Sequence, residues 1–392
     1  MIILDEPYVS DHLISWVEQS GHPVLNNPMA QTIAQNHTLN LVSEEEAKKR
    51  LNEGERIYTN SENALIWITE NVSNPALCEG INIFKDKALT RTMLQSLDKD
   101  LFFKTCTSEE LESLDFAELE DHLPFILKPS VGFCSMGVYP IYHKNDWNHA
   151  LARIKSDTAS WNELYPNSVI DTNTFLIEGF ISGTEYALDA FFDEAGDAHI
   201  LTVLRHDFAS ETDTSDRMYL TSVEIYDEVH DIFLDWLNQV NKLVKVSNFP
   251  VHVEVRLEKD ADHARVHVIE FNPLRFAGLG GTDISLHAFD FYSYGAFLEN
   301  KLPSREQMVE KSKGHTFCMS LLNPPSDLEE HATFDYQAFC ERFGKVVDLV
   351  PFDPAQTGMF GFAFLEVLPG HEDEIEYLKT TDLSEFISVD PA

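Results

Sequence analysis

The chain has 392 residues, 43% of them hydrophobic and 11% aromatic, which is enough for two or three domains and too long for one ordinary core. Aspartate and glutamate number 66 against 28 lysines and arginines, and the resulting net charge of -38 excludes nucleic acid and anionic lipid as expected partners. No apolar stretch approaches the roughly 20 residues of a membrane-spanning helix, so we expect no membrane association.

The N-terminus and the cysteines both favour a cytoplasmic protein. Residues 1–10, MIILDEPYVS, run from a short apolar segment straight into acidic residues, without the basic region of a secretion signal. The cysteines are odd in number and never form a CxxC pair, so we expect neither a disulfide framework nor a zinc site. They are Cys78, Cys106, Cys134, Cys318 and Cys340.

Residues 1–83 predict a small open α/β domain. Residues 1–4 and 64–68 (ALIWI) suit buried strands because both are short apolar runs. Between them, SEEEAKKRLNEG places Ser43 as a helix N-cap with Glu46 three residues later, which is the pattern of a capping box.

Downstream, the pattern predicts α+β lobes followed by a small appended domain. Residues 84–122 predict helices, and strands separated by glycine turns follow from Leu123. A long helix over 227–246 precedes two strands that we expect to form a hairpin across Ala261, Asp262 and His263. These changes of pattern divide the chain into 1–83, 84–182, 183–305 and 306–392.

A lysine followed by a glycine-rich loop is the first stretch that suggests chemistry. Lys128 ends an apolar strand, and the loop after it contains Gly132, Ser135 and Gly137. Glycines let backbone N–H groups approach a polyphosphate closely, and a lysine adds a positive charge beside the same oxygens. The loop is not a Walker motif, because GxxxxGK[ST] is absent. An ordinary glycine hairpin with a surface lysine has the same local pattern, and that alternative stays open.

A second stretch, TFLIEGFISGTEY, joins two strands through a short linker. Glu178 ends the first strand, Phe180 and Ile181 lie in the linker, and Glu185 opens the next strand. A linker between two lobes can bind an adenine edge through its backbone, with carboxylates binding the exocyclic amine and the ribose. A plain hairpin with two solvated glutamates explains this stretch equally well.

The third stretch predicts a metal site. VHVEVR is followed by VHVIEFNPLR, so that Glu254 lies on one strand and Glu270 and Asn272 on the next. If these strands pair antiparallel, the three side chains converge as oxygen ligands, the kind that Mg2+ prefers. A carboxylate among apolar neighbours is also costly to bury without a cation beside it. A half-exposed hairpin is the alternative, and it leaves the E-x-N-P at a strand end unexplained.

The three stretches, in this order, resemble the ATP-grasp superfamily over roughly residues 1 to 300. The resemblance implies a pre-ATP-grasp α/β domain, two lobes that clasp ATP and the use of Mg2+ or Mn2+. It implies phosphate contacts from the loop and two lysines, adenine and ribose contacts from the linker, and metal ligands from the hairpin. These are Lys87, Lys128, Ser130, Ser135 and Gly137; Glu178, Phe180, Ile181 and Glu185; and Glu254, Glu270 and Asn272.

One position departs from the family pattern. In many members an arginine lies two residues after the asparagine and stabilises the transferring phosphoryl group. Here that position is Leu274, and Arg275 comes one residue later, so a slight bulge is needed to aim it inward. We expect Arg275 and Lys128 to be catalytic.

The residues beyond the hairpin are candidates for substrate binding. Gly280, Gly281 and Thr282 offer backbone donors just past the metal site, suited to a carboxylate or an oxyanion. Arg205 and His206, at a strand end, could bind an amino acid, although a satisfied surface cluster also accounts for them.

The sequence thus predicts an ATP-dependent ligase that activates a small carboxylate, such as an amino acid, as an acyl phosphate and joins it to an amine. A small-molecule kinase and a non-catalytic ATP-binding protein are the alternatives on the same fold. Biotin-dependent carboxylation is disfavoured because the chain has no M-K-M motif. The oligomeric state stays open, with a homodimer common among similar proteins.

Overall fold

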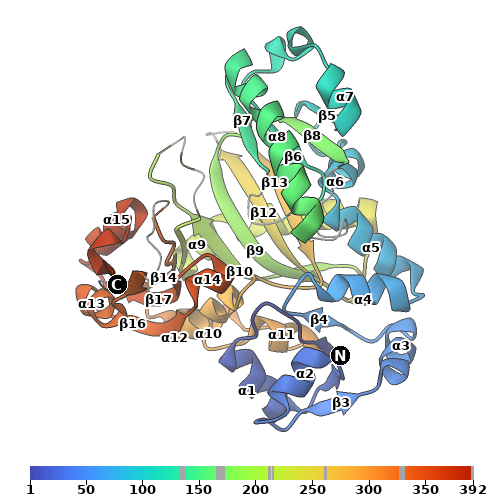
Figure 1. Ribbon diagram of the computed structural model, residues 1–392. Helices are drawn as coiled ribbons and strands as arrows, with labels where there is room; N and C mark the ends of the chain where they lie inside the picture. Colours follow the sequence, from blue (N-terminus) through green and yellow to red (C-terminus); the bar gives the residue numbers. More distant parts are fainter. Residues whose placement is uncertain are drawn as a thin grey trace.

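The computed structural model describes residues 1–132, 137–164, 173–210, 213, 216–259, 263–325 and 332–389. Figure 1 shows a large central sheet, with a smaller sheet above it, the N-terminal unit to one side below and the C-terminal segment on the opposite side. Within the described residues, every helix is too short or too polar to cross a bilayer.

The N-terminal unit is the α/β arrangement that the sequence predicts. Its four short strands are parallel and lie in the order β3-β2-β1-β4. Ser10 and Ser43 cap α1 and α3 by accepting hydrogen bonds from Leu13 N and Glu46 N. The elements are β1 (Ile2–Ile3), α1 (Asp11–Ser20), β2 (Pro23–Leu25), α2 (Pro28–Ile33), β3 (Asn40–Val42), α3 (Glu44–Asn52) and β4 (Tyr58–Thr59).

The strand predicted for residues 64–68 is wrong, because this segment begins helix α4 (Ala64–Asn71). Its buried residues are Ala64, Leu65 and Ile68, whose spacing places them on one face of a helix. A short apolar run does not distinguish a buried strand from a buried helix turn. Two further helices follow. The helix α5 (Pro75–Lys85) was not predicted, whereas α6 (Lys87–Leu94) lies in the segment predicted as helical.

The smaller sheet has the antiparallel order β5-β8-β6-β7. The prediction of helices alone over 84–122 missed β5 (Phe103–Thr107), which pairs with β8 (Thr174–Gly179). The other strands are β6 (Phe125–Pro129) and β7 (Tyr139–Ile141). Around them lie α7 (Ser108–Ser113), η1 (Phe116–Glu118), η2 (Glu120–His122) and α8 (Lys144–Leu164). The core of this lobe includes Phe125 and Trp147, whose rings are 6.0 Å apart.

The large sheet has eight antiparallel strands in the order β13-β12-β9-β10-β11-β14-β17-β16. Helix α9 (Val223–Val244) packs on it, with Phe233 5.3 Å from the ring of Tyr186 in β9. The predicted hairpin is present as β12 and β13, although Ala261 and Asp262 of its turn lie outside the described residues. The first five strands are β9 (Thr184–Phe192), β10 (Ala198–His206), β11 (Met218–Thr221), β12 (Phe249–Lys259) and β13 (Ala264–Pro273).

The C-terminal segment extends this large sheet. Strands β14 (Thr316–Leu321), β16 (Val346–Pro351) and β17 (Gly361–Val367) continue it beyond β11, so the segment predicted as an appended domain shares a sheet with the preceding lobe. A small pair, β15 (Ala332–Phe334) and β18 (Ile387–Val389), lies apart from it. The division of the chain at 83, 182 and 305 stays a prediction.

The remaining elements surround the C-terminal half of the large sheet. They are η3 (Gly281–Asp283), α10 (Ile284–Phe289), α11 (Ser293–Glu299), α12 (Arg305–Ser312), α13 (Tyr336–Arg342), α14 (Pro354–Thr357), α15 (Asp373–Thr380) and η4 (Ser384–Phe386).

Candidate active site

A cleft with an empty volume of about 1090 Å³ lies between the smaller and the larger sheet. Most of the residues predicted to bind nucleotide and metal line it, from both lobes. The lining residues are Lys87, Ile126, Lys128, Pro129, Gly132, Val138, Glu178, Phe180, Ile181, Glu185, His206, Phe208, Asp216, Glu254, Arg256, Ile269 and Glu270.

Lys128 and Glu178 form a buried ion pair at the smaller sheet. Lys128 Nζ lies 2.9 Å from Glu178 Oε1, and Arg91 Nε donates to the other carboxylate oxygen. Burial raises the pKa of Glu178, but the charges of Arg91 and Lys128 outweigh it and bring the pKa down to about 2. Burial lowers the pKa of Lys128. The carboxylate of Glu178 is therefore fixed in its charged form by two cations.

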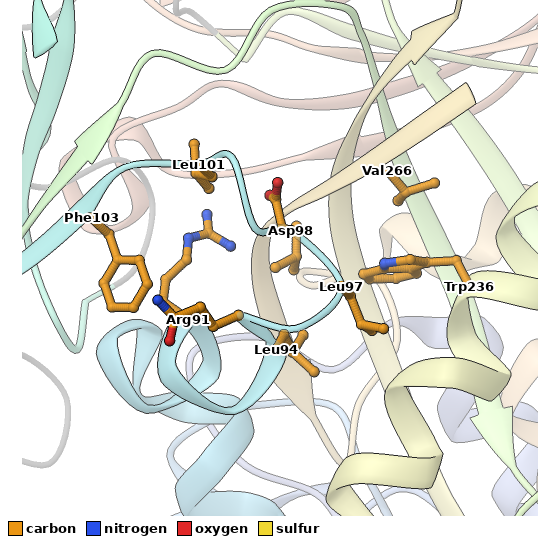
Figure 2. A pocket seen from close by; sticks show the side chains of 10 residues that line it. Arg91, Leu94, Leu97, Asp98, Leu101, Phe103, Trp236 and Val266 are labelled. Atoms are coloured by element: carbon orange, nitrogen blue, oxygen red, sulfur yellow. The ribbon is translucent and has the colours of Figure 1, made fainter. Parts of the chain in front are cut away.

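Arg91, which forms an ion pair with Glu178, also lines a second and smaller cavity (Figure 2). This cavity is also lined by Leu94, Asp98, Trp236 and Val266. Among the described residues, Arg91 Nη2 has no hydrogen-bond partner. The aliphatic and aromatic side chains around it make this cavity part of the packing that orients Arg91.

Lys87 connects helix α6 to both the glycine loop and the metal hairpin. Its Nζ donates to Gly132 O at 2.9 Å and lies 2.7 Å from Glu270 Oε2. Its backbone N–H donates to the carbonyl of Ser130 at 2.8 Å, which fixes the start of the loop. Burial lowers the pKa of Lys87, and the adjacent Glu270 carboxylate more than offsets this, so that the pKa is raised overall.

Glu254 and Glu270 lie directly opposite each other on β12 and β13, because the strands pair antiparallel in that register. Asn272 Nδ2 donates to Glu270 Oε1 at 3.2 Å, so all three predicted metal ligands are neighbours. Burial and the charge of Glu270 raise the pKa of Glu254 well above its usual value. Two facing carboxylates of this kind repel each other, and a divalent cation between them would relieve that repulsion.

Glu185 lies on the larger sheet beside the linker. It accepts a hydrogen bond from Arg256 Nε at 3.0 Å and lies 3.0 Å from His206 Nδ1. Arg256 also donates to the carbonyl of Ile181 at 2.6 Å, and its guanidinium lies 5.6 Å from the ring of Phe180. Arg256 therefore ties the linker to the larger sheet, and the predicted ribose contact of Glu185 stays a prediction.

Arg275 is aimed by an unusual backbone conformation of the residue before it. Leu274 has a φ of +61°, in the left-handed region that side chains other than glycine rarely adopt, and its side chain is fully buried. Arg275 Nη2 then donates to Glu62 Oε1 at 2.7 Å. Although burial lowers the pKa of Arg275, Glu62 raises it most strongly, and the charges of Glu270 and Glu254 contribute in the same direction. Arg275 thus lies in the electric field of Glu254 and Glu270.

The glycine run after Arg275 forms a tightly supported turn. Gly280 has a φ of +82°, and a Cβ placed there would lie 3.2 Å from the side chain of Ser10. Thr282 is buried, and its hydroxyl donates to Asp189 Oδ2 at 2.8 Å, while His252 Nδ1 lies 2.8 Å from Asp189 Oδ1. The Thr282 side chain therefore supports the loop. The backbone N–H of Gly281 does so too, because it donates to Gly278 O at 2.8 Å. The substrate contact predicted for this turn stays a prediction.

The other predicted residues are divided between the cleft and its surroundings. His206 lines the cleft, whereas Arg205, next to it in the strand, points the opposite way and forms a two-pronged pair with Asp207 at 2.7 and 2.9 Å. Gly137 has a φ of +73° at the end of the glycine loop. Ser135 lies outside the described residues.

Comparison of the sequence with known protein families supports the interpretation of this cleft as a nucleotide-binding site. Residues 121–283 match the family model of the ATP-grasp domain. This segment is an ATP-grasp domain. It begins just before β6, contains the linker and ends just past the metal hairpin, so it includes the cleft residues of both sheets except Lys87.

Solved structures of ATP-grasp enzymes have the same fold over nearly the whole chain. An L-amino acid ligase from Bacillus licheniformis is 15% identical with a TM-score of 0.68, and the match covers 100% of this chain and 98% of that one. N5-carboxyaminoimidazole ribonucleotide synthetase from Thermotoga maritima is 13% identical, with a TM-score of 0.62 and coverage of 100% and 99%. The corresponding synthetase from Staphylococcus aureus, complexed with ADP, is 14% identical, with a TM-score of 0.61 and 96% coverage of each chain. No curated protein matches the sequence.

Sequence reasoning missed several charged residues around the ATP-grasp cleft. Arg91 holds Glu178, Glu62 holds Arg275, and Arg256 and Asp216 line the cleft itself. The sequence did contain a signal for Arg256, because residues two apart on a strand share a face and Arg256 follows Glu254 by two. Arg91 also lies among apolar residues in a chain poor in positive charge, whereas nothing local marks Glu62 as the partner of a residue so distant in sequence.

Proposed function

We propose that the protein is an ATP-dependent carboxylate–amine ligase that forms an acyl phosphate and releases ADP and phosphate. The observation that carries this proposal is the convergence of Lys87, Lys128, Glu254 and Glu270 on one cleft between two sheets. Two cations suited to phosphate oxygens and two carboxylates suited to a divalent ion are the charges that phosphoryl transfer requires.

The two lysines would contact the ATP phosphates. Each is paired with a carboxylate, Lys87 with Glu270 and Lys128 with Glu178. Both lysines line the cleft, so phosphate oxygens would take the place of these partners. The glycine loop that begins at Gly132 adds backbone donors beside them.

Glu254, Glu270 and Asn272 would hold Mg2+ or Mn2+. The facing carboxylates fit such an ion because burial and the charge of Glu270 disfavour the ionised form of Glu254, as its raised pKa indicates, and a cation between the two would offset both effects. Carboxylate and amide oxygens are also the donor set that these ions prefer. When bound, the ion supplies charge neutralisation for the triphosphate.

The reaction proceeds in two steps. A carboxylate oxygen of the substrate attacks the γ-phosphorus, and the bond to the β–γ bridging oxygen breaks, which gives an acyl phosphate and ADP. The amine nitrogen of the second substrate then attacks the acyl carbon, loses a proton and expels phosphate, so that a C–N bond replaces the C–O bond. Arg275, close to the metal carboxylates, would stabilise the charge on the transferring phosphoryl group.

The substrates are small molecules, and we propose an amino acid as the carboxylate. The support is the likeness of the whole chain to an L-amino acid ligase and the supported turn at Gly280 and Gly281 beside Arg275. A cytoplasmic location and a homodimer are part of the same proposal.

The test is an ADP-release assay with ATP, Mg2+ and pooled amino acids, followed by mass spectrometry of the products. A joined product that appears in step with ADP and phosphate supports the ligase. A stable phosphorylated product without a joined species would instead identify a small-molecule kinase on the same fold. ATP binding without turnover under any substrate pool would identify a non-catalytic ATP-binding protein.

A further inference from the structure

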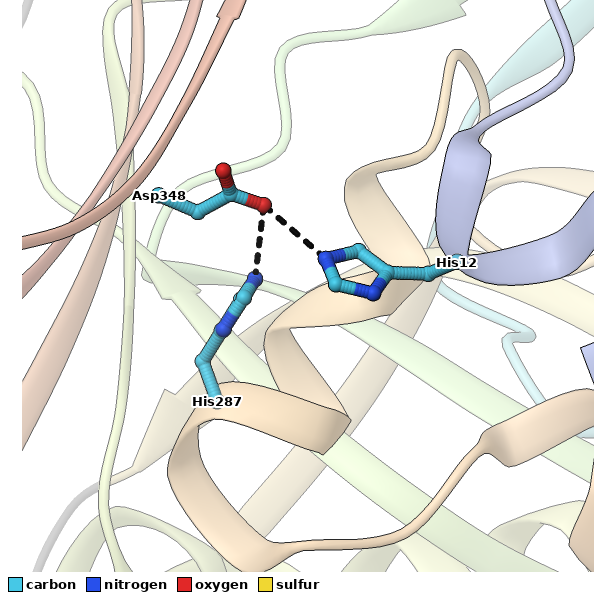
Figure 3. A group of neighbouring side chains, drawn as sticks. All are labelled: His12, His287 and Asp348. Atoms are coloured by element: carbon cyan, nitrogen blue, oxygen red, sulfur yellow. Dashed lines mark hydrogen bonds and ion pairs between the residues drawn. The ribbon is translucent and has the colours of Figure 1, made fainter. Parts of the chain in front are cut away.

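Two histidines and an aspartate meet at the junction of the N-terminal unit, the glycine turn and the C-terminal strands (Figure 3). His12 comes from α1, His287 from α10 and Asp348 from β16. Their ligand atoms all lie within 4.8 Å of one another. None of these residues lines the ATP cleft, so the cluster has no part in the proposed ligase chemistry.

Both distances from Asp348 to the histidines are close to those between ligands of one metal ion. Asp348 Oδ2 lies 3.0 Å from His12 Nε2 and 3.4 Å from His287 Nε2. Ligand atoms of a tetrahedral centre with bonds of 2.0–2.1 Å are about 3.3 Å apart. The imidazole planes cross at 78°, so both Nε2 atoms turn toward the same carboxylate oxygen without the rings stacking.

The surroundings leave these atoms available for a metal. Asp348 Oδ1 accepts the backbone N–H of Leu349 at 2.8 Å, which holds the carboxylate with Oδ2 toward the histidines. His287 Nε2 is buried, and its only contact with a polar group among the described residues is the approach to Asp348 Oδ2 at 3.4 Å, which lacks hydrogen-bond geometry. A buried polar atom without a well-formed hydrogen bond is costly, and coordination of a metal would satisfy it.

We propose that His12, His287 and Asp348 bind a divalent transition-metal ion, for which Zn2+ is the probe. Two imidazole nitrogens favour Zn2+ over Mg2+, which prefers oxygen ligands, so this site differs in kind from the one in the ATP cleft. His12 and Asp348 are partly exposed, which leaves room for water as the fourth ligand. The metal links α1 to β16 and to α10, directly after the glycine turn, and so stabilises the packing of the N-terminal unit.

The test is Zn2+ binding to the full chain after chelation, measured by calorimetry in excess Mg2+ without ATP. We expect one equivalent of Zn2+ to bind and to raise the melting temperature. His12→Ala, at a partly exposed position that tolerates truncation, should weaken Zn2+ binding by roughly 100-fold or more. Substituted Co2+ should give visible absorption bands in the wild type that are absent from His12→Ala.

Two variants separate this site from other sources of binding. His143→Ala removes an exposed histidine that lies 3.3 Å from Asp146, so it controls for surface His–Asp pairs. Glu270→Gln removes a carboxylate of the ATP cleft. Both should bind Zn2+ as the wild type does. Absence of Zn2+ binding to the wild type, equal binding by His12→Ala, or loss of binding in Glu270→Gln would each overturn the proposal and leave a hydrogen-bonded triad.

Discussion

Lys87 Nζ lies 2.7 Å from Glu270 Oε2, so a predicted phosphate-binding cation and a predicted metal ligand neutralise each other across the cleft. Lys128 and Glu178 do the same on the smaller sheet. An unpaired charge at these depths would be costly, and these internal pairs keep the cleft stable without a ligand. We expect a bound metal–nucleotide complex to replace these pairs: the lysines would pair with phosphate oxygens, and Glu270 would bind the metal.

Glu270→Gln should abolish ADP release with every substrate while leaving the fold intact. The amide is nearly isosteric, but it neither carries the charge of a metal ligand nor pairs with Lys87, so activity should fall at least about 100-fold. Circular dichroism and an ADP-coupled assay measure the two effects. Glu228→Gln, at an exposed position of α9, is the matched control and should retain activity. Wild-type turnover by Glu270→Gln would remove the metal assignment.

Lys128→Met should weaken ATP binding without unfolding the protein. The change removes a charged donor to the phosphates, worth about 1.5–3 kcal/mol, and so predicts a roughly 10–100-fold rise in the Kd for ATP. Arg91 remains to neutralise Glu178 in the variant. Fluorescence or calorimetric titration with ATP and Mg2+ gives the affinity, and Lys155→Met, at an exposed position of α8, is the control. Equal ATP affinity in Lys128→Met would contradict a phosphate contact.

Arg275→Ala should lower kcat far more than it changes the KM for ATP. A side chain that stabilises charge developing in the transition state contributes to the rate rather than to ground-state binding, and its loss costs roughly 100–1,000-fold in kcat. Steady-state kinetics with the best substrate pair separates the two parameters. Arg265→Ala, on the strand β13 that precedes Arg275 and largely exposed, should behave as the wild type. If Arg275→Ala raised only KM, Arg275 would be a binding residue and another group would have to serve the phosphoryl transfer.

The sequence predicted the arrangement of the site better than its local structure. The order of Lys128, Glu178 and the E…E-x-N hairpin indicated the fold, because each motif needs a strand end or a linker at a fixed place. ALIWI failed as a strand, since five apolar residues fit either a strand or a helix face. Strand β5 was missed because FKTCT gains its stability from pairing with β8, which is distant in sequence.

Partners that are distant in sequence were beyond prediction for the same reason. Whether Arg275 points inward depends on the left-handed backbone at Leu274, which Pro250 and Thr59 hold through hydrogen bonds to its backbone. The meeting of His12 with Asp348 likewise arises only when the C-terminal strands extend the large sheet. Local patterns carry no information on such contacts, because they follow from tertiary packing.

Glu178 should make the stability of the protein depend on acid pH. Its pKa is about 2 in the folded state against 4.5 for a free glutamate. A carboxyl group with a depressed folded-state pKa stabilises the fold above the unfolded pKa and loses that contribution as pH falls from about 4.5 toward 2. The difference corresponds to a contribution on the order of 3 kcal/mol at neutral pH.

Comparison with Glu178→Gln isolates this contribution from the many other carboxylates, because they are common to both proteins. At about pH 7 the variant should be less stable by roughly 3–5 kcal/mol, since Arg91 and Lys128 lose their buried counter-charge. That deficit should shrink below pH 4.5. Urea unfolding at several pH values measures it, and Glu118→Gln, at an exposed position of the same lobe, should track the wild type throughout. A deficit that stays constant down to about pH 3 would mean that Glu178 titrates normally, and the two cations would then not hold it in its charged form.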